Sequence, residues 1–133
     1  MLLITSRYGW RVNPVTGQRQ FHEGIDLDGS TGDPIVSMTA GVVSRVDRDG
    51  IDRGQINGNA VHIKLQDWRI SYLHLDRVLT AAGAVVVPGT LIGTMGSTGR
   101  SSGSHLHLQV AFGGRTLDPL AIFRARGFPF RFV

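Results

Sequence analysis

Short apolar stretches separated by turn residues run along the whole chain, and several of them alternate apolar with polar positions. Val61 and Ile63, for example, alternate with His62 and Lys64. Successive side chains of an extended strand point to opposite faces, so this alternation predicts a strand with one apolar and one polar face. The same pattern predicts strands over residues 41–47, 60–65, 69–75, 85–87, 91–95 and 105–112.

The predicted strand over residues 105–112 has two unlike faces. Leu106 and the alternate residues that follow it are apolar, whereas His105, His107 and Gln109 lie on the opposite face. Residues i and i+2 of a strand are about 7 Å apart on one face. The two imidazoles therefore project into the same space.

The alternation also assigns faces to two other histidines. It places His74 on the same face as Ile70 and Tyr72, and it places His62 on the polar face of its own strand. No motif surrounds His62. We therefore expect His62 to be a surface residue.

One helix is expected, near the end of the chain. Asp118 is a favourable N-cap, Pro119 suits the first helical position, and Gly127 can adopt the left-handed conformation that ends a helix. These signals predict a helix over residues 118–127. The aromatic tail over 128–133 is expected to pack back onto the domain or to mark a junction with further chain.

The overall pattern is that of a β protein. The chain has 18 glycines and no long helical periodicity, which predicts a mainly β, compact antiparallel fold with one short C-terminal helix. A chain of 133 residues is long enough to form one domain, whose core we place over residues 5–120. The longest irregular stretch, 47–57, is expected to form a mobile loop at the rim of a groove. A second irregular stretch, 96–104, is rich in Gly and Ser and leads directly into His105.

Histidines gather in short motifs that suggest a metal site. His22 and Asp26 stand in His-Glu-Gly-Ile-Asp, His105 and His107 in His-Leu-His, and His74 in Tyr-Leu-His-Leu. Two imidazoles and a carboxylate can hold a divalent ion and leave a coordination position open for water. Two further imidazoles would then lie beside that water. This donor set is typical of a hydrolytic zinc site.

The spacing of the first motif is compatible with a shared ion. His22 and Asp26 are four residues apart, and Gly24 between them permits a bend or a close backbone approach. The chain has no cysteine, so any metal must be bound through nitrogen and oxygen ligands. Glu23 follows His22, but no histidine stands four residues beyond His22, which excludes a thermolysin-like His-Glu-x-x-His helix.

Charge and hydropathy narrow the range of partners. The net charge of +4 suits an anionic partner, but the positive residues are scattered and no nucleic-acid-binding motif occurs, so we expect no nucleic-acid partner. No segment is long and apolar enough to span a membrane, and the apolar run over residues 1–4 is too short for the core of a signal peptide. The protein is expected to act where it is made, to be delivered by another route, or to be a domain cut from a longer chain.

Two other classes of site use similar residues. Non-haem iron oxygenases also bind their metal with two histidines and a carboxylate, but they commonly use His-x-Asp rather than the His-x-x-x-Asp of this chain. The stretch over 96–103 loosely resembles a phosphate-binding loop, but it lacks the Gly-Lys-Ser/Thr ending. Zinc-dependent hydrolysis is therefore favoured over iron oxygenation and nucleotide binding.

A series of motifs in order along the chain resembles the M23 family of zinc metallo-endopeptidases, of the lysostaphin and LytM type. The motifs are Ser6-Arg7-Tyr8-Gly9-Trp10-Arg11-Val12-Asn13-Pro14, Phe21-His22-Glu23-Gly24-Ile25-Asp26, Tyr72-Leu73-His74-Leu75, Gly96-Ser97-Thr98-Gly99 and Ser104-His105-Leu106-His107. The resemblance covers residues 5–120.

This resemblance implies that His22, Asp26 and His107 bind Zn²⁺, and that the catalytic residues His74 and His105 flank the water and the scissile carbonyl. It implies a groove formed by two antiparallel sheets, with the metal at its floor. The implied activity is hydrolysis of peptide bonds in bacterial peptidoglycan, either in the stem peptide or in the crossbridge. Such a protein would act at the cell wall, outside the cytoplasm, as a phage-delivered endolysin or a fragment of a secreted protein, and as a monomer or part of a larger assembly.

The chain departs from the family pattern at two positions. Gln109 stands where many members have glutamate, and Leu65 stands where many have histidine. Neither change removes a predicted ligand, and the amide oxygen of Gln109 can still accept a hydrogen bond. Some relatives that have lost ligands are catalytically silent binding or activator modules, whereas the complete set of five residues here favours an enzyme. Arg11 and Asn13 are candidates to line the groove, and Asn13 equally suits a turn.

Overall fold

The computed structural model describes residues 2–13, 16–101, 103–126 and 130–132. Over these residues the protein is mainly β, as the sequence predicts. The strands are β1 (Leu2–Ser6), β2 (Gly9–Val12), β3 (Arg19–His22), β4 (Ile25–Asp28), β5 (Pro34–Val36), β6 (Gly41–Asp47), β7 (Asn59–Leu65), β8 (Trp68–Val78), β9 (Val85–Val86), β10 (Leu91–Met95), β11 (His105–Phe112), β12 (Arg115–Leu117) and β13 (Phe130–Phe132). The helices are α1 (Gly54–Asn57) and α2 (Pro119–Arg124).

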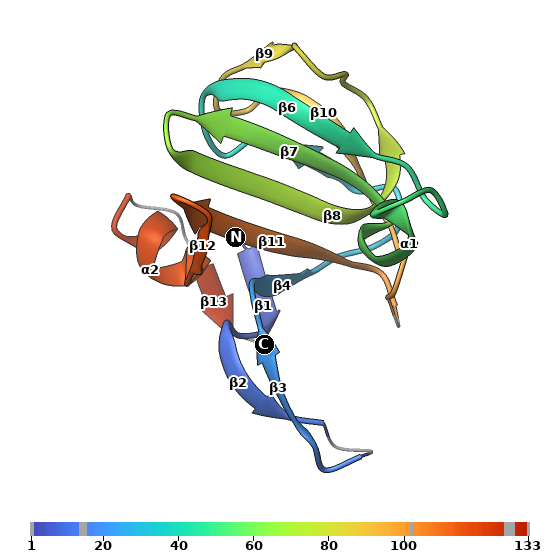
Figure 1. Ribbon diagram of the computed structural model, residues 1–133, viewed down its shortest axis with the longest axis vertical. Helices are drawn as coiled ribbons and strands as arrows, with labels where there is room; N and C mark the ends of the chain where they lie inside the picture. Colours follow the sequence, from blue (N-terminus) through green and yellow to red (C-terminus); the bar gives the residue numbers. More distant parts are fainter. Residues whose placement is uncertain (1, 14–15, 102, 127–129, 133) are drawn as a thin grey trace.

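The strands form two sheets, and their pairing is antiparallel apart from one pair. The larger sheet has 11 strands and follows the order β13-β1-β4-β11-β8-β7-β6-β9, with β10 paired to β8 and β5 and with β12 paired to β11. The smaller sheet is the β2–β3 hairpin, which projects from the rest of the molecule (Figure 1). Among the described strands, β1 and β13 are the parallel pair. The antiparallel two-sheet fold expected from the sequence is confirmed.

The core lies against the apolar faces of the central strands. Alternation in β7 buries Val61 and Ile63 while Lys64 is exposed, and in β11 it buries Leu106 and Leu108. Each fully buried aliphatic side chain of this kind stabilises the fold by about 1.5–3 kcal/mol. A one-residue slip of β11 would turn this apolar set away from the core. Core packing therefore fixes which residues of β11 face the other way, toward the site.

The predicted C-terminal helix is present as α2. Leu120 N–H donates to the carboxylate of Asp118 over 2.9 Å, so Asp118 is the N-cap, and Pro119 occupies the first turn. Phe123 is buried and anchors the helix on the core. The predicted end at Gly127 lies outside the described residues.

A second helix, α1, lies in the stretch that the sequence predicts to be irregular. It spans four residues and is closed by backbone hydrogen bonds from Asn57 N–H to Arg53 O and from Gly58 N–H to Gly54 O, each 2.9 Å long. A single helical turn is too short to give a periodic pattern, which is why the sequence does not reveal it. In the part of the chain that is described, neither helix has the length and hydropathy that a membrane-spanning helix needs.

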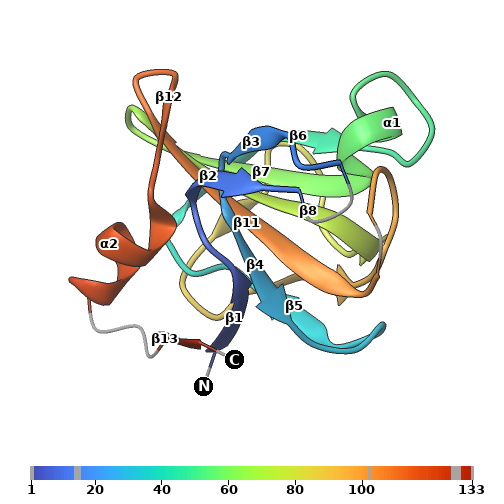
Figure 2. The ribbon, with the colours of Figure 1, turned by 90° about the horizontal axis from the view of Figure 1, so that it is seen from below.

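The end of the chain returns to its beginning. In the tail, β13 pairs with β1 at Leu2↔Phe130 and at the two following positions, and Figure 2 shows the two strands side by side. This backbone pairing fits the first of the two expectations for the tail, that it packs back onto the domain. Residues 127–129 and 133 lie outside the description.

Candidate metal centre

Three strands bring the first group of site residues together. His22 is the last residue of β3, Asp26 lies in β4, and His107 lies in β11 directly opposite Asp26 in the strand register. The β3–β4 connection passes close to β11. A Cβ added to Gly24 would lie 2.8 Å from His107 Nε2 and even closer to the carbonyl oxygen of Leu108. The close approach expected at Gly24 is therefore present.

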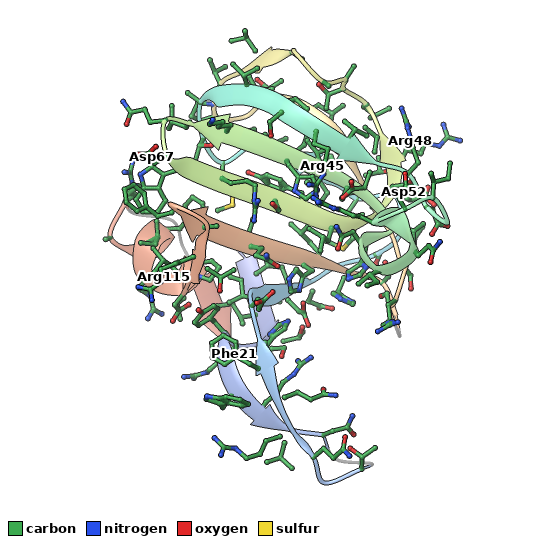
Figure 3. The ribbon with its side chains drawn as sticks, in the orientation of Figure 1. Phe21, Arg45, Arg48, Asp52, Asp67 and Arg115 are labelled. Carbon is green, nitrogen blue, oxygen red and sulfur yellow. The ribbon has the colours of Figure 1, made fainter. Side chains whose placement is uncertain are left out.

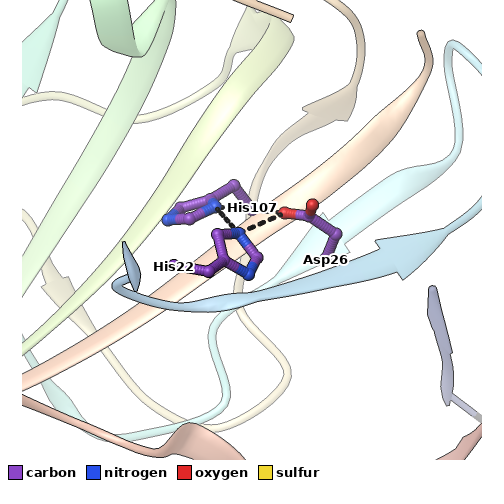
Figure 4. Close-up of side chains that lie close together, drawn as sticks. All are labelled: His22, Asp26 and His107. Atoms are coloured by element: carbon purple, nitrogen blue, oxygen red, sulfur yellow. Dashed lines mark hydrogen bonds and ion pairs between the residues drawn. The ribbon is translucent and has the colours of Figure 1, made fainter. Parts of the chain in front are cut away.

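The polar atoms of this group form a small triangle (Figure 4). His107 Nδ1 is 3.0 Å from Asp26 Oδ1, His22 Nε2 is 3.3 Å from the same oxygen, and the two imidazole nitrogens are 3.2 Å apart. The three side chains, all buried or partly buried, are a group that can hold a metal ion. We call these three atoms the ligand triangle.

The remaining ring nitrogens of both histidines have fixed partners. His22 Nδ1–H donates to the carbonyl oxygen of Arg7 over 2.8 Å, and His107 Nε2–H donates to Gln109 Oε1 over 3.1 Å. The other nitrogen of each ring faces the ligand triangle, and in a neutral ring with this tautomer it is free to bind a metal ion. Gln109 therefore accepts through its amide oxygen, as the sequence predicts.

The carboxylate of the triangle is held in its charged form. Burial acts to raise the pKa of Asp26, but hydrogen bonds from His107 and His22 outweigh it and hold this pKa far below its usual range. Asp26 is thus a carboxylate at neutral pH. An ionised carboxylate with two neutral imidazoles is a donor set that suits a divalent cation.

The dimensions of the ligand triangle fit zinc. Tetrahedral Zn²⁺ with ligands about 2.0–2.1 Å away has ligand atoms about 3.3 Å from one another. The three edges of 3.0, 3.2 and 3.3 Å lie close to that value. Three protein ligands leave one position of a tetrahedron open, which is the arrangement of catalytic rather than structural zinc.

Two more imidazoles lie beside the triangle. The His74 ring lies 5.4 Å from the His105 ring and 6.0 Å from the His107 ring, measured between centroids. His74 Nδ1–H donates to the carbonyl oxygen of Thr98 over 2.7 Å, and His105 Nδ1–H donates to that of Gly103 over 2.9 Å. In the neutral form of either ring, Nε2 is therefore the nitrogen without a proton. The structure thus brings together all five residues singled out from the sequence.

The face predicted for His74 is wrong. Ile70 and Tyr72 belong to the core, whereas His74 turns toward the ligand triangle on the other side of the sheet. The cause lies in the backbone, because His74 has φ 65° and the β7–β8 register shifts between Asn59 and Val61. A left-handed residue breaks the alternation on which the prediction relies. Strained backbone of this kind is concentrated at functional sites.

The environment of His74 favours its neutral form. Burial is the largest cause that lowers its pKa, and the charges of His107 and His105 act in the same direction. The hydrogen bond to Thr98 and the charge of Asp26 oppose this shift without cancelling it. At neutral pH the Nε2 of His74 is therefore a hydrogen-bond acceptor.

The five residues line an open hollow of about 330 Å³. Its walls are formed by Arg11, His22, Asp26, His74, Arg100, Ser101, His105 and His107. Arg11 lines the site as proposed from the sequence. Asn13 is instead part of a turn, where its side chain accepts from Thr16 N–H over 3.2 Å. The sequence does not single out Arg100 and Ser101, although they lie in the irregular stretch 96–104 that leads into His105.

The wall of the hollow at Arg100 and Ser101 belongs to a loop that interlocks with a second loop over residues 48–58. Asp49 accepts from Gly99 N–H over 3.1 Å, and the carbonyl oxygen of Ile56 accepts from Arg100 N–H over 2.9 Å. Gly58 and Gly99 both have positive φ, and a Cβ on either would overlap the other loop. The first of these loops also carries the carbonyl group that holds His74. The packing of these two loops therefore helps to position His74, a candidate catalytic residue.

The prediction that His62 is a surface residue is wrong. His62 is only 4% exposed; its Nε2–H donates to Asp47 Oδ2 over 2.7 Å, and its Nδ1 accepts from the hydroxyl of Ser71 over 2.7 Å. Asp47 also accepts from Arg45 and Asn57. Side chains from the neighbouring strands therefore cover His62, although Lys64 on the same face is exposed. Burial lowers the pKa of His62.

Comparison with known proteins identifies the family of this chain. The sequence profile of Peptidase family M23 matches residues 20–119. The chain is 39% identical over 113 residues to the peptidoglycan DD-endopeptidase ShyC of Vibrio cholerae, and the match covers 84% of this chain and 25% of the relative. The chain spans about a quarter of the length of the curated relatives it matches.

Solved structures show the same fold. The catalytic domain of a mutant of the prophage-encoded M23 protein EnpA from Enterococcus faecalis has a TM-score of 0.77 and 31% identity, and the match covers 89% of this chain and 88% of that one. A zinc-containing peptidase from Vibrio cholerae has a TM-score of 0.74 and 32% identity, over 86% of this chain and 36% of that one. The chain therefore belongs to peptidase family M23, a family of zinc metallopeptidases.

Proposed function

We propose that this chain is a zinc-dependent endopeptidase that hydrolyses peptide bonds in bacterial peptidoglycan, in the stem peptide or the crossbridge. The observation that carries the proposal is the ligand triangle, whose edges of 3.0–3.3 Å match tetrahedral zinc, together with two further imidazoles that present Nε2 beside it. Membership of family M23 supports the same reaction.

In this proposal His22, Asp26 and His107 hold Zn²⁺. When bound, the ion lowers the pKa of water and polarises a carbonyl oxygen. Arg7 O and Gln109 Oε1 would keep the two ligand rings oriented through their second nitrogens. The carboxylate of Asp26 balances part of the positive charge of the ion.

His74 and His105 move the protons. One imidazole starts neutral and accepts a proton at Nε2 from the attacking water, whereas the other starts protonated on both nitrogens and donates its Nε2 proton to the leaving nitrogen. The oxygen of water joins the carbonyl carbon, the C–N bond breaks, and the products are a carboxylic acid and an amine. Because each Nδ1–H is tied to a backbone carbonyl group, both rings present the same nitrogen throughout the reaction.

The proposed substrate class is inferred from the names of the relatives. ShyC is named a peptidoglycan DD-endopeptidase, and EnpA is a prophage-encoded member of the family. We therefore place the action of this chain at the cell wall, outside the cytoplasm. Delivery by a phage and release as part of a secreted protein both fit that location.

The test is digestion of purified peptidoglycans that differ in stem and crossbridge, with mass analysis of the fragments. Zinc-loaded protein is expected to release fragments whose masses differ by the addition of water at one type of peptide bond. His22→Ala is expected to lose the metal, whereas His105→Ala is expected to keep it and lose turnover. If the zinc-loaded protein binds peptidoglycan and releases no fragment, the chain is a silent wall-binding module instead.

A further inference from the structure

The backbone at His74 has a conformation that a residue with a Cβ keeps only when its surroundings hold it there. Its φ of 65° lies in the left-handed region, inside strand β8. The strand also carries one extra residue at this point. Asn59 pairs with Leu75 and Val61 pairs with Tyr72, so β8 advances by three residues while β7 advances by two. His74 therefore lies in a β-bulge, where the regular ladder of hydrogen bonds is interrupted.

Two side chains from outside β8 occupy the backbone carbonyl groups that follow His74. The hydroxyl of Thr98 donates to Leu75 O over 2.6 Å. The amide nitrogen Nδ2 of Asn59 donates to the same oxygen over 3.3 Å and to Asp76 O over 3.0 Å. Backbone carbonyl groups need hydrogen-bond partners, and a bulge removes those that the ladder supplies. The two side chains therefore fix the path of the chain directly after His74.

The amide of Asn59 is itself held by the loop between β6 and β7. Its Oδ1 accepts from Asp49 N–H over 2.9 Å. Arg48 and Asp52, labelled in Figure 3, mark this loop beside α1. Because the oxygen of the amide is used by the loop, the nitrogen is the atom that faces β8 as a donor. The orientation of Asn59 is thus fixed from both sides.

Thr98 holds both the backbone and the ring of His74. Its hydroxyl accepts from Asn59 N–H over 3.0 Å, which leaves the hydroxyl hydrogen to point at β8. Its carbonyl oxygen accepts from His74 Nδ1–H over 2.7 Å. One residue therefore links the position of the bulge to the tautomer of the imidazole.

We propose that Asn59 and Thr98 are positioning residues, whose side chains hold the β8 bulge so that the His74 ring faces the hollow with Nε2 toward the ligand triangle. The catalytic consequence of this inference rests on the proposed peptidase function. Without these donors β8 relaxes toward regular alternation, which turns residue 74 away from the hollow. The three candidate zinc ligands lie on β3, β4 and β11, so zinc binding does not depend on the bulge.

The kinetic test removes each donor in turn from zinc-loaded protein. Thr98→Val deletes the hydroxyl with little change of shape, and Asn59→Ala deletes the amide. Each is expected to lower kcat for peptidoglycan hydrolysis roughly ten- to a hundredfold, as a small displacement of a catalytic group does, with KM and zinc affinity unchanged. Thr98→Ser keeps a hydroxyl and is expected to recover most of the lost kcat.

Thr94→Val is the matched control. The hydroxyl of Thr94 accepts from Arg77 N–H over 3.2 Å, so this variant also removes a side-chain hydrogen bond to β8, but beyond the bulge. It is expected to leave kcat unchanged. Wild-type kcat in both Thr98→Val and Asn59→Ala would overturn the proposal.

A spectroscopic measurement separates this proposal from the proposed function. Long-range ¹H–¹⁵N correlation spectra of zinc-loaded protein report which nitrogen of each imidazole carries the proton. The His74 proton is expected on Nδ1 in the wild type and in Thr94→Val, and to be shared between both nitrogens in Thr98→Val and Asn59→Ala, because the ring leaves the carbonyl group of Thr98. If this change occurs but wild-type protein hydrolyses no peptidoglycan, the peptidase function fails and the positioning role stands. If hydrolysis occurs and the His74 tautomer is the same in all variants, the positioning role fails alone.

Discussion

Replacing Gly24 with alanine tests how the backbone holds the metal centre. A Cβ at this position would lie 2.8 Å from His107 Nε2 and closer still to Leu108 O. Non-bonded carbon atoms normally keep about 3.5 Å from other heavy atoms. The contact with the His107 ring therefore needs a shift of roughly 0.7 Å, and the contact with Leu108 O needs a shift of roughly 1.1 Å. The carbonyl group belongs to a central strand and moves with difficulty. The ligand triangle therefore absorbs most of the shift.

The expected size of the effect follows from this displacement. Overpacking a rigid site costs about 1–3 kcal/mol, and zinc ligands tolerate departures of only about 0.2 Å. Gly24→Ala is thus expected to weaken zinc binding by a factor of at least roughly ten to a hundred, comparable with loss of a residue that orients a ligand. It is also expected to lower the Tm of the metal-free protein.

The assay is competition for zinc against a chelator of known affinity, combined with thermal unfolding of the metal-free protein. The matched control is Gly103→Ala, because a Cβ on Gly103 meets no atom within 4 Å. The control is expected to bind zinc as tightly as the wild type. Wild-type zinc affinity in Gly24→Ala would refute the argument that the close approach of Gly24 shapes the ligand triangle.

Three further outcomes are expected. Gln109→Ala removes the acceptor for His107 Nε2–H and is expected to weaken zinc binding roughly ten- to a hundredfold, measured by the same chelator competition, while Gln109→Glu retains it. Gly99→Ala would force apart the two interlocked loops, and is expected to reduce kcat by more than it reduces zinc content, as peptide hydrolysis and metal analysis would reveal. The third outcome concerns pH. Burial lowers the pKa of His62, and for Asp47 hydrogen bonds outweigh the opposing effect of burial and lower its pKa too. The unfolded chain therefore binds more protons than the folded one. The stabilisation of the folded state that these two pKa shifts provide is complete above pH 6.5, the ordinary pKa of histidine, and is lost as pH falls. The Tm of metal-free protein is expected to drop on acidification below that value, and His62→Gln should flatten the dependence; a Tm that rises on acidification would contradict this sign.

Local patterns in the sequence predict much of the strand structure and the two motifs that hold the candidate ligands, His22 with Asp26 and His105 with His107. Alternation along β11 places His105 and His107 on one face, and the structure has them there. The pairing of His107 with Asp26 across 81 residues of sequence depends on the register between β4 and β11. No local pattern encodes that register. The resemblance to a known family, rather than a local pattern, is what brings Asp26 and His107 together in the prediction.

The wrong predictions for His74 and His62 share a physical cause. Alternation places His74 on the core side because it assumes regular extended backbone, and a φ of 65° turns this residue toward the ligand triangle. The alternation of one strand says nothing about the side chains of neighbouring strands, and these cover His62. The place of Arg100 in the hollow depends on packing between two loops, which no local pattern predicts. Each of these features is set by tertiary contacts rather than by the residues next in sequence.

The central claim is that His22, Asp26 and His107 share one zinc ion. The most direct measurement is a crystal structure of zinc-loaded protein with anomalous data recorded at the zinc absorption edge. The expected result is one strong peak about 2.0–2.2 Å from His22 Nε2, Asp26 Oδ1 and His107 Nδ1. A peak at another place, or full peptidase activity in rigorously chelated protein, would contradict it.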